Sequence, residues 1–253
     1  MRSLLKRRPK KPHAAIEPVP SALPVLSNAQ IAATFAGQRI AGDFYDSFRV
    51  SPSRVLFGLL DVAGRRAQNE EIFSAAQQIF REAGAELLGA AEVNETDALT
   101  QLCLQLNRSI IETAGAVHPC PAFAGCYNEE LGTVCYFNAG HTPGLARHAN
   151  DVSELGATGL PLGLFSHTTS DARMIALEPG AALLLVSRGV VEAECNREEF
   201  GLLRVEQALR AASRTSAHVV CVAVLDAVQH FASEPTTQED VTALALIRYP
   251  TSS

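Results

Sequence analysis

Residues 54–64 read Arg-Val-Leu-Phe-Gly-Leu-Leu-Asp-Val-Ala-Gly, and the interpretation of the chain starts from them. Residues 54–60 form a short apolar run that is rich enough in large hydrophobic side chains to be a buried strand. The run stops at Asp61, and a carboxylate at the end of a buried strand is costly unless something pairs with it. The sequence therefore predicts a strand that delivers an acid to its end.

The hydrophobic pattern changes its period after Gly64. Apolar residues recur at steps of three and four over 72–87, which is typical of a helix with one buried face. A second helical pattern covers 99–110, and Asn94 with Asp97 before it indicates a capped start. The sequence therefore predicts two consecutive helices after the first buried strand.

Strand-like patterns follow the two helices. Runs at 123–127 and 133–137 flank 128–132 and predict a hairpin, and further strands are expected over 145–148, 182–186 and 241–247. Helices are expected over 202–211 and 217–231. This order lacks the regular βαβ alternation of a doubly wound sheet. We therefore expect an α+β fold, a layered sandwich with helices packed on antiparallel sheets.

Composition divides the chain into a leader, residues 1–27, and a domain, residues 28–253. The leader contains five prolines and six basic residues, and we expect it to be disordered and solvated, although contact with a membrane or an acidic partner remains an alternative. Without those six charges the formal net charge of −6 becomes −12, and an acidic body argues against nucleic-acid binding. Nearly half of the residues are hydrophobic, enough for a substantial core.

The six cysteines form no C-x-x-C pair, and no secretory signal precedes them. No apolar run approaches the roughly 20 residues that span a bilayer, so we expect a cytoplasmic protein with no membrane span. A zinc site from His118, Cys120, Cys126 and Cys135 is conceivable, but its spacing is wrong for a zinc knuckle. Small buried hydrophobic residues are the favoured interpretation of these cysteines.

Carboxylates gather where strands are expected to end. Asp43 and Asp46 stand beside Gly42, Asp61 ends the first buried strand, and Glu239 with Asp240 precedes the last strand. Each acid alone is best explained as a turn or helix cap. Together, such acids would repel one another, and a hard divalent cation would resolve that repulsion. The sequence lacks a phosphate-binding P-loop, a nucleophile elbow and an H-E-x-x-H pair, and His141 is interpreted as a turn or core residue.

Six short segments of the chain form a recognisable series: 42–46 (GDFYD), 61–64 (DVAG), 138–143 (NAGHTP), 159–164 (GLPLGL), 187–193 (SRGVVEA) and 239–242 (EDVT). In their order and spacing, from about residue 30 onward, the chain resembles PPM-type (protein phosphatase 2C-like) serine/threonine phosphatases of the bacterial SpoIIE-like branch.

The resemblance implies two central antiparallel sheets flanked by helices. It also implies that two Mg²⁺ or Mn²⁺ ions activate a water for attack on a phosphoserine or phosphothreonine. By position, Asp43 would serve one metal, Asp61 would bridge both, and the Val62 carbonyl would add a ligand. The segment 239–240 would help to complete the other site, with Glu239 in the place of an aspartate and Asp240 beside it.

Three departures from the family pattern affect that site. Arg188 replaces the aspartate of the S-D-G segment, Glu239 is one methylene longer than the usual residue, and Gly64-Arg65-Arg66 replaces G-K-G. A guanidinium near a divalent ion would be repelled by roughly 8 kcal/mol at 4 Å and an effective dielectric near 20. Arg188 must therefore swing outward, weaken the metal, or pair with Asp61, Glu239 or Asp240.

Two functions follow from the resemblance. The first is metal-dependent hydrolysis of a regulatory phosphoprotein, possible substrates including an anti-anti-sigma (STAS-type) factor, with activity reduced by Arg188. The alternative is an inactive pseudophosphatase that acts as a binding module. Because the leader is too short to hold a sensor domain, control would have to come from a separate protein or from a homodimer, if there is any control.

Overall fold

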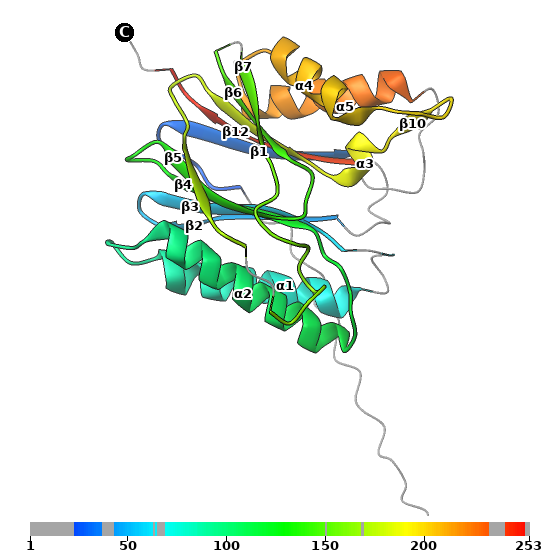
Figure 1. Ribbon diagram of the computed structural model, residues 1–253. Helices are drawn as coiled ribbons and strands as arrows, with labels where there is room; N and C mark the ends of the chain where they lie inside the picture. The colour runs from blue at the N-terminus through cyan, green and yellow to red at the C-terminus, as the bar shows by residue number, and fades with distance from the viewer. Residues whose placement is uncertain are drawn as a thin grey trace, which may run out of the picture.

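The computed structural model describes residues 23–36, 43–62, 64, 69–149, 151–167, 170–232 and 241–250. Two five-stranded sheets face each other, and helices cover the outer face of each, so the described chain forms four layers (Figure 1). The expected α+β sandwich of two antiparallel sheets flanked by helices is confirmed.

The first sheet contains the strand that opened the sequence analysis. Its order is β2 (Asp43–Ser51), β3 (Arg54–Asp61), β4 (Ala122–Asn128), β5 (Thr133–Ala139) and β8 (Arg173–Ala176). Every neighbouring pair is antiparallel. All eight residues of β3 are buried, as the apolar run predicts, and β4 with β5 confirms the predicted hairpin.

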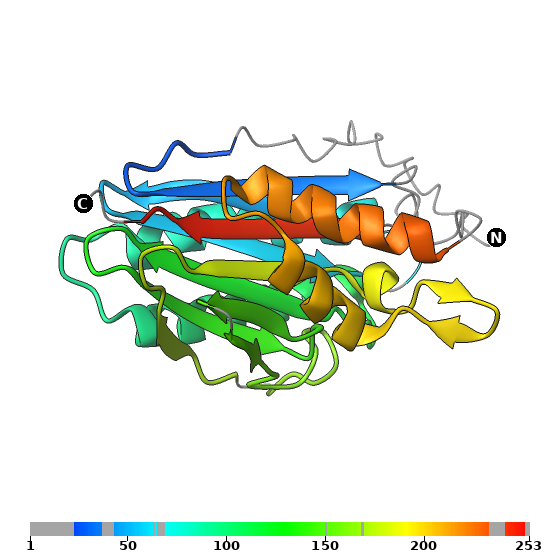
Figure 2. The same cartoon turned by 90° about the horizontal axis from the view of Figure 1, so that it is seen from above.

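The second sheet joins both ends of the described chain. Its order is β1 (Ala29–Ala36), β12 (Val241–Arg248), β9 (Ala182–Val186), β6 (Gly144–His148) and β7 (Asp151–Leu155). The strands expected over 145–148, 182–186 and 241–247 are therefore present. A small separate hairpin, β10 (Glu194–Cys195) with β11 (Glu198–Glu199), projects from one end (Figure 2).

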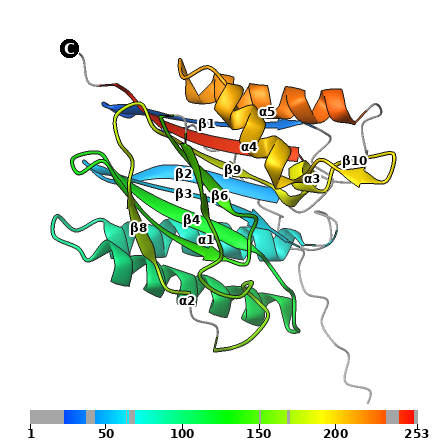
Figure 3. The ribbon, with the colours of Figure 1, turned by 45° about the horizontal axis from the view of Figure 1, so that its top comes forward.

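Helices α1 (Glu70–Leu88) and α2 (Glu95–Ala114) cover the first sheet, and α4 (Gly201–Ala211) and α5 (Ala217–Phe231) cover the second (Figure 3). The Asn94 side chain accepts hydrogen bonds from the backbone N–H groups of Thr96 and Asp97, so the predicted capped start is confirmed. Helix α2 ends at Gly115, whose φ of 64° is the left-handed conformation that favours glycine there. A four-residue helix, α3 (Arg188–Val191), follows β9 directly.

Alternate residues of a strand pack in different layers of the core. On β3, Leu56 and Leu60 pack with the α1–α2 side, whereas Phe57 and Leu59 pack in the layer between the two sheets. Since successive side chains of a strand point to opposite faces, Asp61 continues the inter-sheet face. The layer between α4, α5 and the second sheet forms a third hydrophobic cluster.

Arg54 interrupts the apolar character of β3 for a structural reason. Its Nε lies 2.8 Å from Glu95 Oε1, and its two terminal nitrogens donate to the carbonyls of Ala90 and Ala91 at 2.7 and 3.0 Å. Both charged side chains are buried, so pairing removes most of the penalty of burying either one. The pair fixes the corner between α1 and α2 against the sheet.

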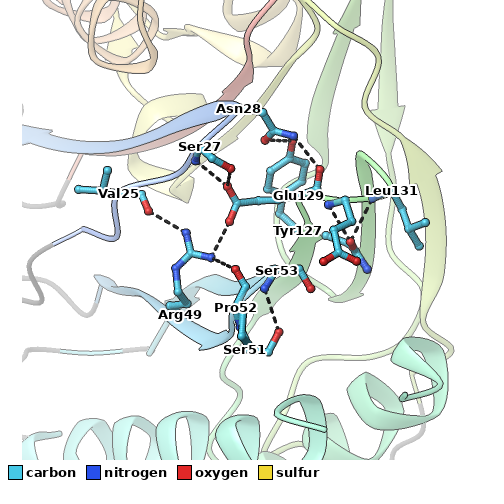
Figure 4. A network of polar contacts seen from close by, with 12 residues as sticks. Val25, Ser27, Asn28, Arg49, Ser51, Pro52, Ser53, Tyr127, Glu129 and Leu131 are labelled. Carbon is cyan, nitrogen blue, oxygen red and sulfur yellow. Dashed lines mark hydrogen bonds and ion pairs between the residues drawn. The ribbon is translucent and has the colours of Figure 1, made fainter. Parts of the chain in front are cut away.

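A polar network connects the segment before β1 to two turns of the first sheet (Figure 4). Glu129 accepts hydrogen bonds from the backbone N–H and hydroxyl of Ser27, both at 2.7 Å, and pairs with Arg49 at 2.5 Å. Arg49 also donates to the Val25 carbonyl at 2.7 Å, and Asn28 Nδ2 donates to the Glu129 carbonyl at 2.6 Å. The network holds the two sheets together at the end where β2 turns into β3.

Residues 25–27, which the sequence analysis assigns to the leader, therefore have specific partners. The rest of the leader up to residue 22 lies outside the described residues. Within the part of the chain that the structure covers, no helix is both long enough and apolar enough to cross a membrane.

Candidate active site

Asp43 and Asp61 lie directly opposite each other in the antiparallel pair of β2 and β3. Asp43 is the first residue of β2, and Asp61 is the last residue of β3. Opposite residues of an antiparallel pair share one face, and their Cβ atoms are about 4.5–5.5 Å apart. The register therefore brings these two carboxylates together at one end of the first sheet.

Both carboxylates belong to the inter-sheet face. Tyr45 on β2 and Leu59 on β3 alternate with the helix-facing residues and pack in the inter-sheet cluster, which places Asp43 and Asp61 in the same layer. Asp61 is 7% exposed, and its backbone N–H donates to the Pro121 carbonyl at 2.9 Å. That bond fixes the end of β3 beside the segment that leads into β4.

Arg188 reaches Asp61 from the second sheet. It is the first residue of α3, immediately beyond β9, and its Nε donates to Asp61 Oδ2 at 3.1 Å. The same nitrogen lies 3.9 Å from Glu192 Oε2, and half of the Arg188 side chain is exposed. Of the alternatives that the sequence left open for Arg188, the structure has an ion pair with Asp61. Helix α3, which begins at Arg188, lies beside β10 at one end of the sandwich (Figure 3).

Ser187 holds the start of β12 next to Arg188. The Ser187 N–H donates to the Thr242 carbonyl at 2.9 Å, and the Thr242 N–H donates to Ser187 Oγ at 3.0 Å. Both residues are buried. The two remaining candidate ligands, Glu239 and Asp240, precede β12 in the sequence and lie outside the described residues.

His141 has the turn role that the sequence indicates. Its backbone N–H donates to Asn138 Oδ1 at 2.8 Å, and its Nδ1 lies 3.0 Å from the Thr142 hydroxyl. Burial lowers the pKa of the imidazole, while the Thr142 backbone and the charge of Asp61 act in the opposite direction. His141 is therefore a neutral side chain near the acids and part of the framework of the site.

Gly140 allows this turn to pack closely. Its φ is 68°, and a Cβ at this position would lie 2.6 Å from Pro161 Cδ. Any larger residue would clash with the 159–164 segment. Gly140 thus allows the turn after β5 to lie against Pro161 of the following loop.

A further acid of the 42–46 segment has a role that sequence reasoning did not assign. Asp46 is fully buried on the helix-facing side of β2 and forms a bidentate pair with Arg81 of α1, at 2.7 and 3.0 Å. The Arg81 guanidinium also lies 5.2 Å from the centre of the Phe48 ring. The sequence did contain a signal for this pair, because Arg81 is a basic residue on a helix that was expected to cover the sheet.

The paired carboxylates have the donor chemistry that a hard divalent cation requires. The register places Asp43 opposite Asp61 at one end of the sheet, and the Arg188 guanidinium bonded to Asp61 opposes a cation on that side. No group of three or more His, Cys, Asp or Glu residues suited to a metal occurs among the described residues. Among the described residues, the expectation of a metal site therefore rests on the Asp43–Asp61 pair and the Val62 backbone, and Glu239 and Asp240 lie outside these residues.

The four residues considered for zinc do not form a common site among the described residues. Cys126 and Cys135 face each other between β4 and β5, and Cys120 Sγ lies 3.3 Å from the His118 carbonyl. Burial raises the pKa of the Cys120 thiol to about 12 and that of Cys135 to about 11. The cysteines at 103, 120, 126, 135 and 221 are buried, in agreement with their interpretation as small hydrophobic residues.

Comparison with known proteins identifies the same family as the motifs. The model of a family described as Stage II sporulation protein E (SpoIIE) matches residues 51–249. Protein IcfG of Synechocystis sp. is 21% identical over 252 residues, which cover 91% of this chain and 39% of IcfG. The chain thus spans well under half the length of this relative.

Solved structures share the fold. The RsbU and RsbW domains of Rv1364c from Mycobacterium tuberculosis match with a TM-score of 0.72 and 22% identity, over 91% of this chain and 63% of that one. The SiaA-PP2C domain of Pseudomonas aeruginosa matches with a TM-score of 0.72 and 16% identity, over 87% and 85%. At such identities these likenesses establish the fold.

Proposed function

This chain belongs to the SpoIIE family, and from that premise we propose that it hydrolyses phosphoserine or phosphothreonine in a bacterial regulatory phosphoprotein, at a rate reduced by Arg188. The observation that carries the proposal is the cross-strand register of Asp43 and Asp61. In the reaction, a water oxygen bonds to phosphorus, the ester P–O bond breaks, and the serine or threonine oxygen leaves with a proton.

Asp43, Asp61 and the Val62 carbonyl are the groups that would hold a Mg²⁺ or Mn²⁺ ion, with Glu239 and Asp240 proposed for a second. Such an ion, when bound, supplies a water of lowered pKa and neutralises charge on the phosphate. RsbX, which shares the fold at a TM-score of 0.63 and 11% identity, is described in complex with magnesium, and this supports the choice of cation.

Contacts within this chain affect the site in two opposite ways. The Pro121 hydrogen bond fixes the end of β3, which carries Asp61, and the Ser187–Thr242 hydrogen bonds fix the start of β12. Arg188 acts against cation binding, because its positive charge satisfies Asp61 Oδ2. A cation must compete with this ion pair, which is why we propose reduced activity.

A binding module without turnover is the second candidate function. The Arg188–Asp61 ion pair favours it, because the pair supplies a positive charge of the protein's own where the family has a metal-ligand aspartate. In this case the domain would recognise the phosphoprotein and leave it intact. For either function we propose a phosphorylated regulator, such as a STAS-type anti-anti-sigma factor, as the partner.

Release of p-nitrophenol from p-nitrophenyl phosphate with Mn²⁺ distinguishes the two functions. If the domain is an enzyme, the wild type exceeds background and Asp61→Asn falls to it, because the substitution removes a charge that binds the cation. Glu154→Gln on β7, an exposed acid in the second sheet, is the control and should keep the wild-type rate. Equal background rates for wild type and Asp61→Asn would leave the binding module as the surviving function.

A further inference from the structure

Arg147 on β6 has the largest side chain that is fully buried in the described part of the chain. Its exposed fraction is 1%, yet two of its three guanidinium nitrogens, Nε and Nη2, are buried without a hydrogen-bond partner. A buried donor without a partner is costly, and a buried charge is costly unless it is paired. The local structure therefore leaves half of the requirement of this side chain unmet.

The third nitrogen, Nη1, has a structural role. Arg147 lies on the same face of β6 as Leu145, which packs in the cluster under α4 and α5. Helix α4 packs on β6 and β7 (Figure 1). The last carbonyls of a helix have no partner within it, and Nη1 donates to the carbonyls of Leu209 and Ala212, the latter at 2.9 Å. This role explains one side of the guanidinium and leaves the edge formed by Nε and Nη2.

The Nε–Nη2 edge is suited to an oxyanion. Its two N–H groups point in the same direction, and their spacing matches two oxygens of a carboxylate or a phosphate. The same chain contains an example of this geometry, because Arg81 Nε and Nη2 donate to the two carboxylate oxygens of Asp46 at 2.7 and 3.0 Å. Arg147 presents the same pair of donors with no such acceptor.

The neighbouring strands do not supply an acid to this edge. Val152 on β7 and Ala182 on β9 lie directly opposite Arg147, and both are apolar. Glu154 lies diagonally across on β7, within reach of a long side chain, but it is exposed. Among the described residues, no acid forms an ion pair with Arg147.

A second positive charge lies nearby instead. Arg214 follows α4, and its Nη2 donates to the Ala149 carbonyl at the end of the β6 strand. Burial, and to a smaller extent the charge of Arg214, lower the pKa of the Arg147 guanidinium. Two cations thus act on each other in a chain whose formal net charge is −6, and an anion between them would relieve both the repulsion and the missing hydrogen bonds.

We propose that Arg147 binds a small oxyanion through Nε and Nη2, in a site between β6 and the connection of α4 to α5, residues 212–216. Carboxylates and phosphate share the required pair of oxygens, and the probes below separate them. The site lies toward the opposite end of β6 from the His141 turn, so it is distinct from the Asp43–Asp61 pair. This inference does not depend on the proposed phosphatase activity.

The connection of α4 to α5 is the part of the cover that can admit a ligand. Its residues Ser213, Arg214 and Thr215 are exposed. Exposed connections open locally at a much lower free energy than the core of a domain. Because the strand neighbours of Arg147 are apolar and closely packed around it, only an anion of a few atoms would fit.

A nuclear magnetic resonance titration of the full chain tests the proposal. The readout is the side-chain Nε–H signal of Arg147, assigned through its bonds to the Arg147 backbone. The additions are sodium formate, sodium phosphate and sodium chloride at constant ionic strength, with a chelator that removes divalent cations. We expect a saturable shift with formate or with phosphate and none with chloride.

The probe that produces the shift identifies the ligand class. Formate alone indicates a site for a carboxylate, and phosphate indicates room for a tetrahedral anion. No saturable shift with either anion would overturn the proposal and would mean that water satisfies these nitrogens. An equal shift with chloride would also overturn it, because the effect would then be one of charge without the two-oxygen geometry.

Variants supply the second measurement, the anion-dependent rise in the thermal unfolding midpoint. Arg147→Lys keeps the charge but lacks the paired donors, so it should weaken binding by about tenfold. Arg210→Lys, at an exposed position on α4, is the matched control and should respond as the wild type does. If Arg147→Lys does not fold, the titration of the wild type decides alone.

Two further results would contradict the site. An equal rise in the unfolding midpoint of the wild type and of both variants would place the effect of the anion elsewhere. A shift of the Arg147 Nε–H signal in Glu154→Gln before any anion is added would show that Glu154 occupies the Nε–Nη2 edge in solution.

Discussion

Arg188 Nε lies 3.1 Å from Asp61 Oδ2, and this hydrogen bond joins the end of a strand in one sheet to the first turn of a helix attached to the other. The motif resemblance predicts a metal-ligand aspartate at the position of Arg188, and Arg188 contacts Asp61, the acid proposed to bind a cation. On that proposal, Arg188 in place of an aspartate removes one negative charge and neutralises a second. The effects of substituting Arg188 follow from this pair.

Arg188→Asp should raise the affinity for Mn²⁺. Removing the guanidinium frees Asp61 from a charge that opposes a cation by several kcal/mol at close range, and the new carboxylate adds an oxygen ligand. We expect at least about a tenfold gain, equivalent to about 1.4 kcal/mol, in calorimetric titration. Phosphatase activity should rise in parallel.

Arg210→Asp is the matched control for that substitution. Arg210 is also half exposed and also pairs with a glutamate four residues away, but it lies on α4. It should leave Mn²⁺ affinity unchanged. If Arg188→Asp binds Mn²⁺ no better than Arg210→Asp does, the position of Arg188 beside a cation site is refuted.

Arg81→Met should destabilise the fold. The substitution removes the charged partner of Asp46, a carboxylate that is fully buried, while the Arg81 side chain itself is 42% exposed. We expect a loss of about 1–3 kcal/mol in the free energy of unfolding by urea. Gln78→Met, at an exposed position three residues earlier on the same helix, should change it little. Equal effects of both substitutions would show that the Asp46–Arg81 pair contributes nothing.

Glu129→Gln should lower the free energy of unfolding near neutral pH and should have little effect on it at acidic pH. Burial alone would raise the pKa of the Glu129 carboxyl, but bonds from Ser27 and Arg49 outweigh burial and hold the pKa below its ordinary value of 4.5. The carboxylate therefore stabilises the fold fully above pH 4.5, and this contribution disappears as pH falls through the lower folded-state pKa.

We expect a difference of about 1–3 kcal/mol between wild type and Glu129→Gln at pH 7 in urea unfolding, shrinking toward zero at low pH. The neighbouring Glu130 is exposed, and Glu130→Gln should match the wild type throughout. A Glu129→Gln deficit that stayed constant with pH would contradict the role of the ionised carboxylate.

Cys195 should be the cysteine that reacts readily with a thiol reagent in the native protein. It is half-buried, whereas the other five cysteines are buried. Burial raises the pKa of Cys103 and Cys221 to about 12, which leaves almost no thiolate at pH 8. Titration with Ellman's reagent should show one fast thiol in wild type, none in Cys195→Ser, and six in denatured wild type. Several fast thiols in the native protein would be inconsistent with the packing.

Elements with a strong hydrophobic period could be predicted from the sequence. The run at 54–60 matches β3, and the helical patterns match α1 and α2, because burial on one face imposes that period on these segments. Strands β8, β10 and β11 and helix α3 have two to four residues each, too few to show a period. Their conformation depends on neighbours that are distant in the sequence.

Dependence on distant residues also decides which parts of the site could be predicted from the sequence. Asp43 and Asp61 were candidates because each lies at the end of a strand, and the register places them together. Asp46 was quoted in its motif without a role, since its partner Arg81 lies 35 residues away on a helix. The orientation of Arg188 remained open because it is set by an acid 127 residues earlier in the chain.

The ion pair of Arg188 and Asp61 bridges the two halves of the sandwich at the end opposite the Glu129 network. A cation that takes up Asp61 Oδ2 must first break a bond that fastens these halves to each other. Cation binding at Asp61 and the ion pair that joins the two sheets therefore compete at this end of the molecule. A cation bound here would weaken the contact between the sheets next to its own site.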